Sequence, residues 1–161
     1  MDTTMKKFIL IVLFLPVWAG CTKFGFSHNK DFTYTGCSTS TDTRAVEDDG
    51  IVSLLTLKYE DGDLRVIRKN ALLNCSFKED GLVCDVSIED DVIHYLVYKK
   101  ESKDGIDTAC LCIVEEISSL VTGLETGKEY TFYYSCSPII KPFTFVFEKD
   151  LFLVKDTVVF N

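Results

Sequence analysis

Proline, glycine and basic side chains are scarce in this chain of 161 residues, and each scarcity excludes a class of protein. Three prolines and nine glycines are too few for a collagen-like repeat or a disordered tail. Seventeen basic side chains stand against 25 acidic ones, which gives a net charge of −8 at pH 7. An acidic chain lacks the positive surface that nucleic acids require, so we expect no nucleic-acid partner.

Histidine is also rare, which leaves few residues that could act as a catalytic base. A cysteine or serine nucleophile needs a nearby base, and the chain has only two histidines, His28 in a polar segment and His94 in an apolar strand pattern. No phosphate-binding glycine loop, nucleophile elbow or zinc-protease motif occurs. The sequence therefore predicts a non-enzymatic protein that needs no cofactor or metal.

The first twenty residues have the pattern of an export signal. Lys6 and Lys7 precede an apolar run over residues 8–17, and the small residues Ala19 and Gly20 follow it. The run is about ten residues long, whereas a membrane-spanning helix needs roughly twenty. We therefore expect the first twenty residues to be a cleaved signal peptide rather than a transmembrane anchor.

The end of this segment, Trp18-Ala19-Gly20-Cys21, resembles the lipobox of bacterial lipoproteins, with tryptophan in the usual place of leucine. The resemblance implies cleavage after Gly20 and acylation of Cys21 by a diacylglyceryl thioether and an N-linked chain such as palmitate. Several acyl chains give effectively permanent anchoring. Thr22 replaces the aspartate that retains many such proteins in the inner membrane. The resemblance thus implies a cell-envelope location at the periplasmic face of the outer membrane.

The mature chain has two parts that differ in the spacing of their apolar residues. Residues 22–50 are polar, and we expect a tether and loop there with one short strand at 32–35. From residue 51 onward apolar side chains alternate with period two, and no window fits an amphipathic helix. About eight or nine short strands predict an all-β domain over 51–161, an antiparallel sandwich or barrel. The expected strands cover 51–59, 64–68, 71–77, 82–88, 92–99, 108–115, 130–136, 142–148 and 151–160.

A turn signal at residues 78–81 predicts that the strands 71–77 and 82–88 form a hairpin. In the second of these strands, Asp85 and Ser87 alternate with apolar residues. We therefore expect these two side chains to lie on a face of the sheet that is in contact with water.

The stretch from Leu124 to Tyr130 resembles the E–F corner of fibronectin type III domains, which carry Leu-x-Pro-Gly-x-x-Tyr. Leu124, Gly127 and Tyr130 match in identity and spacing, and Thr126 replaces the proline. In that family the tyrosine ring packs into the core and its hydroxyl bonds to nearby backbone. The resemblance implies an immunoglobulin-like sandwich rather than a barrel. It does not imply membership of the family, because the only tryptophan is Trp18 in the signal.

A wider resemblance extends from Arg68 to Cys136. The series Arg68-Lys69-Asn70-Ala71-Leu72-Leu73-Asn74-Cys75, then Cys110-Leu111-Cys112, then Gly123-Leu124 with Gly127 and Tyr130, is similar to small lipoproteins of Bacteroides and its relatives. Those proteins have no assigned activity, so the resemblance implies a location and a fold and no chemistry.

Six cysteines remain beyond the acylated one, and an even count in an exported chain is typical of disulfides. They are Cys37, Cys75, Cys84, Cys110, Cys112 and Cys136. Cys110 and Cys112 point the same way on a strand, so we expect a bridge from one of them to Cys75 or Cys84. Two alternatives remain open, namely buried thiols and a metal site. Zinc ligands usually lie two to four residues apart on a turn, unlike these strand cysteines.

Two functions of different class follow from these patterns. The first is a non-enzymatic binding or assembly module of the cell envelope, anchored to the membrane through Cys21, which takes an envelope protein or a glycan on loops or an edge strand. Phe143, Phe145 and Phe147 share one face and are a candidate surface, with core packing as the alternative. The second is an envelope glycan hydrolase that uses two loop carboxylates, as suggested by acidic pairs such as Asp48-Asp49.

Overall fold

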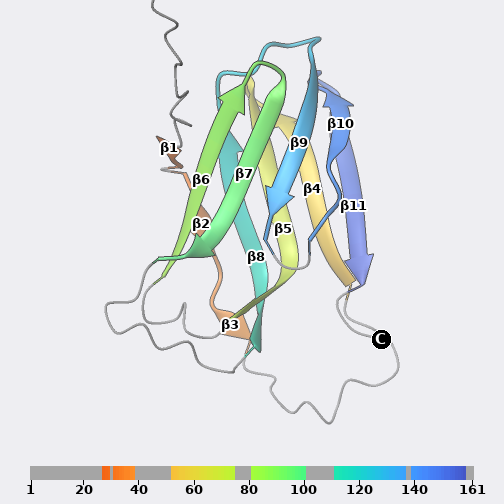
Figure 1. Cartoon of the computed structure of the whole chain (residues 1–161). Coiled ribbons are helices and arrows are strands. Elements are labelled where there is room, and N and C mark those ends of the chain that lie inside the picture. The colour runs from red at the N-terminus through yellow and green to blue at the C-terminus, as the bar shows by residue number, and fades with distance from the viewer. Residues whose placement is uncertain are drawn as a thin grey trace, which may run out of the picture.

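A computed structural model describes residues 27–29, 31–38, 52–74, 81–100, 111–136 and 139–158. Two β-sheets pack face to face, and the described residues contain no helix (Figure 1). Sheet A contains, in order, β1 (Ser27–His28), β6 (Leu82–Glu89), β7 (Val92–Lys99), β9 (Glu129–Ser135) and β10 (Phe143–Val146). Sheet B contains β11 (Phe152–Val158), β4 (Val52–Glu60), β5 (Asp63–Asn74), β8 (Leu111–Val121) and β2 (Thr33–Tyr34), while β3 (Cys37–Ser38) also pairs with β8. The predicted β-sandwich is confirmed.

Two tight turns have backbone angles that their residue types tolerate. Asp61 and Gly62 join β4 to β5 with φ angles of 52° and 102°, and Glu60 pairs with Asp63 across the turn. Asp90, with a φ angle of 53°, begins the turn between β6 and β7. Two-residue hairpin turns need positive φ angles, which glycine, asparagine and aspartate adopt most readily. These residues therefore fix the register of both hairpins.

The core lies between the sheets and follows the alternation along each strand. Leu55 and Leu57 of β4 and Leu64 of β5 are fully buried in sheet B, and Ile93 and Phe132 are fully buried in sheet A. Fully burying a side chain of this size stabilises the fold by about 1.5–3 kcal/mol.

The predicted hairpin of strands 71–77 and 82–88 is wrong. The first stretch belongs to β5 in sheet B, which pairs with β4 and β8, and the second is β6 in sheet A, which pairs with β1 and β7. A turn signal shows that the chain changes direction but does not choose the partner of each strand. The chain therefore crosses from one sheet to the other at this point.

β5 also continues past Arg68, where the expected strand ended. Asn70 has a φ angle of 54°, and the inward-facing positions change from Arg68 before it to Ala71 after it. β5 pairs with β8 on both sides of Asn70, with Lys69 opposite Glu116 and Ala71 opposite Val114. One residue in the left-handed region thus shifts the alternation without ending the strand.

Asp85 and Ser87 were predicted to lie in water, and this prediction is wrong. The two residues are only 8% and 4% exposed. The hydroxyl of Tyr98 donates a 2.7 Å hydrogen bond to a carboxylate oxygen of Asp85. A buried polar group is tolerated where it has such a partner. Polar residues at alternate positions therefore do not identify a solvated face in this strand.

One strand pair departs from a purely antiparallel sandwich. β7 and β9 run parallel, with Val92 opposite Thr131 and Leu96 opposite Ser135. The chain leaves sheet A after β7, forms β8 in sheet B and returns as β9. Because this connection is much longer than a hairpin turn, it allows a parallel return.

Part of the segment that was expected to be a tether is built into the sheets. The backbone N–H of Asn29 donates a 3.0 Å hydrogen bond to the carbonyl of Cys84, and that of Thr35 donates one of 2.9 Å to Glu116. The strand expected at 32–35 is present as β2. The sandwich therefore includes residues on the N-terminal side of 51. Residues 1–26, which include the expected signal peptide and Cys21, and residues 39–51 lie outside the described residues.

Candidate functional site

The corner between β8 and β9 has the geometry that its sequence resemblance implies. Tyr130 is 2% exposed, and its hydroxyl accepts a 2.9 Å hydrogen bond from the backbone N–H of Glu125. Leu124 is buried, and Gly127 has a φ angle of 85° that favours glycine. All three matching residues thus shape the connection between β8 in one sheet and β9 in the other. They do not form a binding site.

Two of the predicted cysteines are buried thiols that are not in disulfides, Cys84 on β6 and Cys136 after β9. Burial raises the pKa of Cys84 to about 11. The thiolate is the form that attacks substrates, so burial disfavours the reactive form of Cys84. The bridge expected at Cys84 is wrong, and the alternative of a buried thiol holds for this residue.

Cys112 is 2% exposed on β8 and is not among the free thiols of the described residues. The bridge from Cys110 or Cys112 to Cys75 stays a prediction, because the side chains of Cys37, Cys75 and Cys110 lie outside those that the structure describes. Within the described ranges, no group of three histidine, cysteine, aspartate or glutamate side chains is placed to hold a metal ion. No helix in those ranges is long and apolar enough to span a membrane.

A polar cluster that was not predicted lies in the core between the sheets. The guanidinium of Arg68, which is 1% exposed, lies 5.4 Å from the centre of the Tyr134 ring. Tyr134 stacks on Tyr95, and the hydroxyl of Tyr95 lies 2.6 Å from that of Ser119. Burial lowers the pKa of Arg68 and raises those of both tyrosines. Because solvent does not reach the cluster, it is not a site for substrates.

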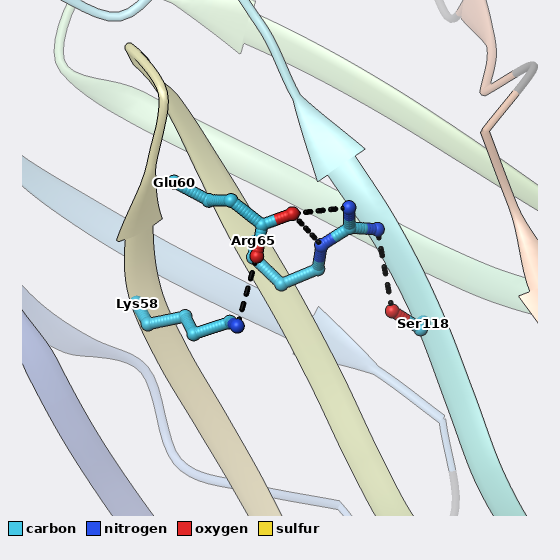
Figure 2. Close-up of polar contacts among 4 residues, drawn as sticks. All are labelled: Lys58, Glu60, Arg65 and Ser118. Atoms are coloured by element: carbon cyan, nitrogen blue, oxygen red, sulfur yellow. Dashed lines mark hydrogen bonds and ion pairs between the residues drawn. The ribbon is translucent and has the colours of Figure 1, made fainter.

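A second polar cluster lies on the outer face of sheet B, as Figure 2 shows. The Nε atom of Arg65 donates a 3.1 Å hydrogen bond to Glu60, and the Nζ atom of Lys58 lies 2.8 Å from the other carboxylate oxygen. Arg65 also reaches the hydroxyl of Ser118 at 3.5 Å. The hydrogen bonds from Arg65 and then Lys58 lower the pKa of Glu60 from 4.5 to about 2. The cluster ties three strands together.

This cluster predicts a pH dependence of stability. Because the pKa of Glu60 is lower in the folded chain than in the unfolded one, its contribution is complete above pH 4.5 and is lost as the pH falls to about 2. We expect Glu60→Gln to lower the free energy of unfolding near pH 6. The difference from the parent should shrink steadily below pH 5. Urea titrations between pH 2 and 7 measure it, and a difference that is independent of pH contradicts the assignment.

β10 and β11, the edge strands of the two sheets, lie side by side (Figure 1). A groove of about 380 Å³ opens beside them. Its walls come from the connection between β9 and β10 and from β11, two segments that are distant in the sequence. The lining residues are Ile139, Ile140, Lys141, Pro142, Phe143, Lys155 and Asp156. This volume lies in the range of small-molecule sites.

The groove combines an apolar wall with positive charge. Ile140 is buried, Phe143 is half-buried, and Ile139 is 80% exposed at the opening. Lys155 shares its face of β11 with Leu153, which packs against the core, and its Nζ atom lies 5.2 Å from the centre of the Phe143 ring. Among the described residues, neither Lys155 nor Lys141 forms an ion pair. The groove therefore offers two ammonium groups and one carboxylate beside an apolar wall.

The predicted phenylalanine surface is largely core. Phe145 and Phe147 are 7% and 0% exposed, and only Phe143 reaches a surface, at the groove. The sequence analysis missed Lys141 and Lys155. The sequence signal for the groove is only that each of these lysines stands beside apolar residues in an acidic chain. That Lys141 and Lys155 line the same groove depends on the pairing of β11 with β4, which no local pattern gives.

The chain was also compared with protein-family models, with curated proteins and with solved structures, and none of the three comparisons found a match.

Proposed function

We propose that this protein is a non-enzymatic binding module of the cell envelope, held at a membrane by acylated Cys21. The resemblance of residues 18–21 to a lipobox supports the anchor and the envelope location. The similarity to small lipoproteins of Bacteroides supports the outer membrane. In this proposal the sandwich is displayed beside the membrane and takes its ligand at the groove between β10 and β11.

The observation that carries the binding function is the make-up of the groove. Ile139 and Pro142 are exposed and Phe143 is half-buried in a part of the fold where both sheets end, and the two lysines form no ion pair within the described ranges. Exposing such residues contributes nothing to folding, whereas a ligand would cover them. The hydrolase alternative is less well supported, because Asp156 is the only carboxylate of this groove and glycoside hydrolysis requires two.

Occupation of the groove can be tested with 1-octanol, a small neutral apolar probe. The chain from Thr22 onward contains every residue that the structure describes and is suitable for NMR. We expect saturable amide shifts at residues 139–143 and 155–156. Ile139→Asp should weaken binding at least about fivefold, because it removes roughly 1 kcal/mol of apolar contact. Ile139 is 80% exposed, so this change leaves the fold intact.

The control is Phe152→Asp. Phe152 is 70% exposed on β11 but does not line the groove, so we expect its loss to leave octanol binding unchanged. If octanol produces no saturable shifts, or if both variants weaken binding equally, the groove is not the binding site and the proposed function fails.

A further inference from the structure

We propose that the groove between β10 and β11 selects an amphiphilic carboxylate, a molecule with one anionic group and an apolar body of about eight carbons. This inference rests on the proposed binding function and specifies its ligand. It is carried by the arrangement of charge in the groove, by the apolar wall beside it and by the volume available.

Charge complementarity identifies the anionic group. The groove contains Lys141 and Lys155 against Asp156, a local excess of one positive charge in a chain of net charge −8. The stem of Lys155 crosses the open side between the sheets, which places its ammonium group beside the ring of Phe143. An ammonium group that is partly shielded by apolar neighbours attracts an anion more strongly than one in bulk water. A neutral or cationic ligand gains nothing from this placement.

The wall of the groove identifies the rest of the ligand. Ile140, Pro142 and Phe143 form an apolar side next to Lys155. A ligand whose carboxylate reaches Lys155 would lay its hydrocarbon part against these residues. Each methylene group that leaves water contributes about 0.8 kcal/mol. The volume of about 380 Å³ accommodates a chain of this length but not a polymer.

The test compares octanoate with 1-octanol, which have the same chain length and differ in charge. By NMR titration we expect octanoate to bind at least about tenfold more tightly than octanol. Lys155→Gln should remove that advantage while leaving octanol binding unchanged, because a charge-assisted contact of this size corresponds to about a factor of ten. Lys155→Arg should retain it. Lys149→Gln, which changes an exposed lysine outside the groove, is the matched control.

The outcomes separate this inference from the function on which it rests. Equal affinity for octanoate and octanol, or an octanoate affinity that Lys155→Gln leaves unchanged, overturns the inference while the groove remains a binding site. Binding of neither probe overturns both. Because Lys155→Gln also removes a contact with Phe143, its binding of octanol shows that the groove is intact.

The same carboxylate chemistry is available from a free fatty acid and from the C-terminus of an apolar peptide. N-acetyl-leucyl-leucine, with its free carboxylate, represents the second source. We assign the groove to a fatty acid, because its wall beside Lys155 is apolar and a peptide bond laid against it would lose its hydrogen bonds to water. We therefore expect octanoate to bind more tightly than the peptide. Tighter binding of the peptide would overturn the fatty acid as occupant, and loss of the dependence on Lys155 for both probes contradicts the carboxylate.

Discussion

Replacing Phe132 with alanine is expected to destabilise the sandwich by about 3–5 kcal/mol. Phe132 of β9 is fully buried, and its ring is the meeting point of the aromatic core. Its centroid lies 5.7–6.4 Å from those of four other rings, which belong to Tyr95, Tyr134, Phe143 and Phe145. Truncation loses the transfer free energy of the ring and leaves a cavity that large, mutually packed neighbours refill poorly.

The next residue on the strand provides the control. Tyr133 points to the other face of sheet A, is 41% exposed and stacks on His94 at 5.0 Å. We expect Tyr133→Ala to cost less than about 1 kcal/mol, because its contacts are with one neighbour and with water. Chemical denaturation measures both variants. Equal losses at the two positions would show that β9 does not alternate between core and surface.

The substitution Cys21→Ala is expected to abolish acylation and, with it, cleavage of the signal. The lipobox resemblance implies that Cys21 carries the acyl chains, and the enzyme that removes a lipoprotein signal acts on the acylated cysteine. In a Gram-negative host, the parent should mature and partition into the detergent phase. The variant should accumulate as a precursor with its signal attached. Each methylene of an acyl chain contributes about 0.8 kcal/mol to anchoring, so the loss is close to all or none.

Mass spectrometry and detergent-phase partition measure this outcome. Thr22→Ala is the matched control, because it changes the neighbouring residue and leaves the cysteine in place. We expect it to mature and partition as the parent does. If the parent matures without added lipid mass and remains in the aqueous phase, then Cys21 is not acylated and the proposed anchor is wrong.

The sequence predicted the class of fold because alternation is a local property. A strand with one buried face repeats every two residues, and buried positions alternate in β4, β7 and β9. The choice of partner strand is not local. A hairpin of β5 and β6 was predicted, yet these strands lie in different sheets, and β9 returns parallel to β7. Those pairings depend on how whole strands pack and not on the residues of a turn.

Arg68 shows the same limit for a single residue. It shares its alternation phase with Leu64 and Val66 and is buried as they are, with the ring of Tyr134 beside its guanidinium. The sequence analysis did not predict a buried arginine, because charge alone favours an exposed position. The groove could not be predicted from any local pattern, because its walls at residues 139–143 and 155–156 belong to the edges of different sheets.

A crystal structure of the chain from Thr22 onward with octanoate bound tests the central claim most directly. We expect the carboxylate within about 4 Å of the Nζ atom of Lys155, the usual limit for an ion pair, with the hydrocarbon chain against Phe143 and Ile140. Octanoate bound elsewhere on the sandwich, or in the groove with its carboxylate directed away from Lys155 and Lys141, would contradict the account.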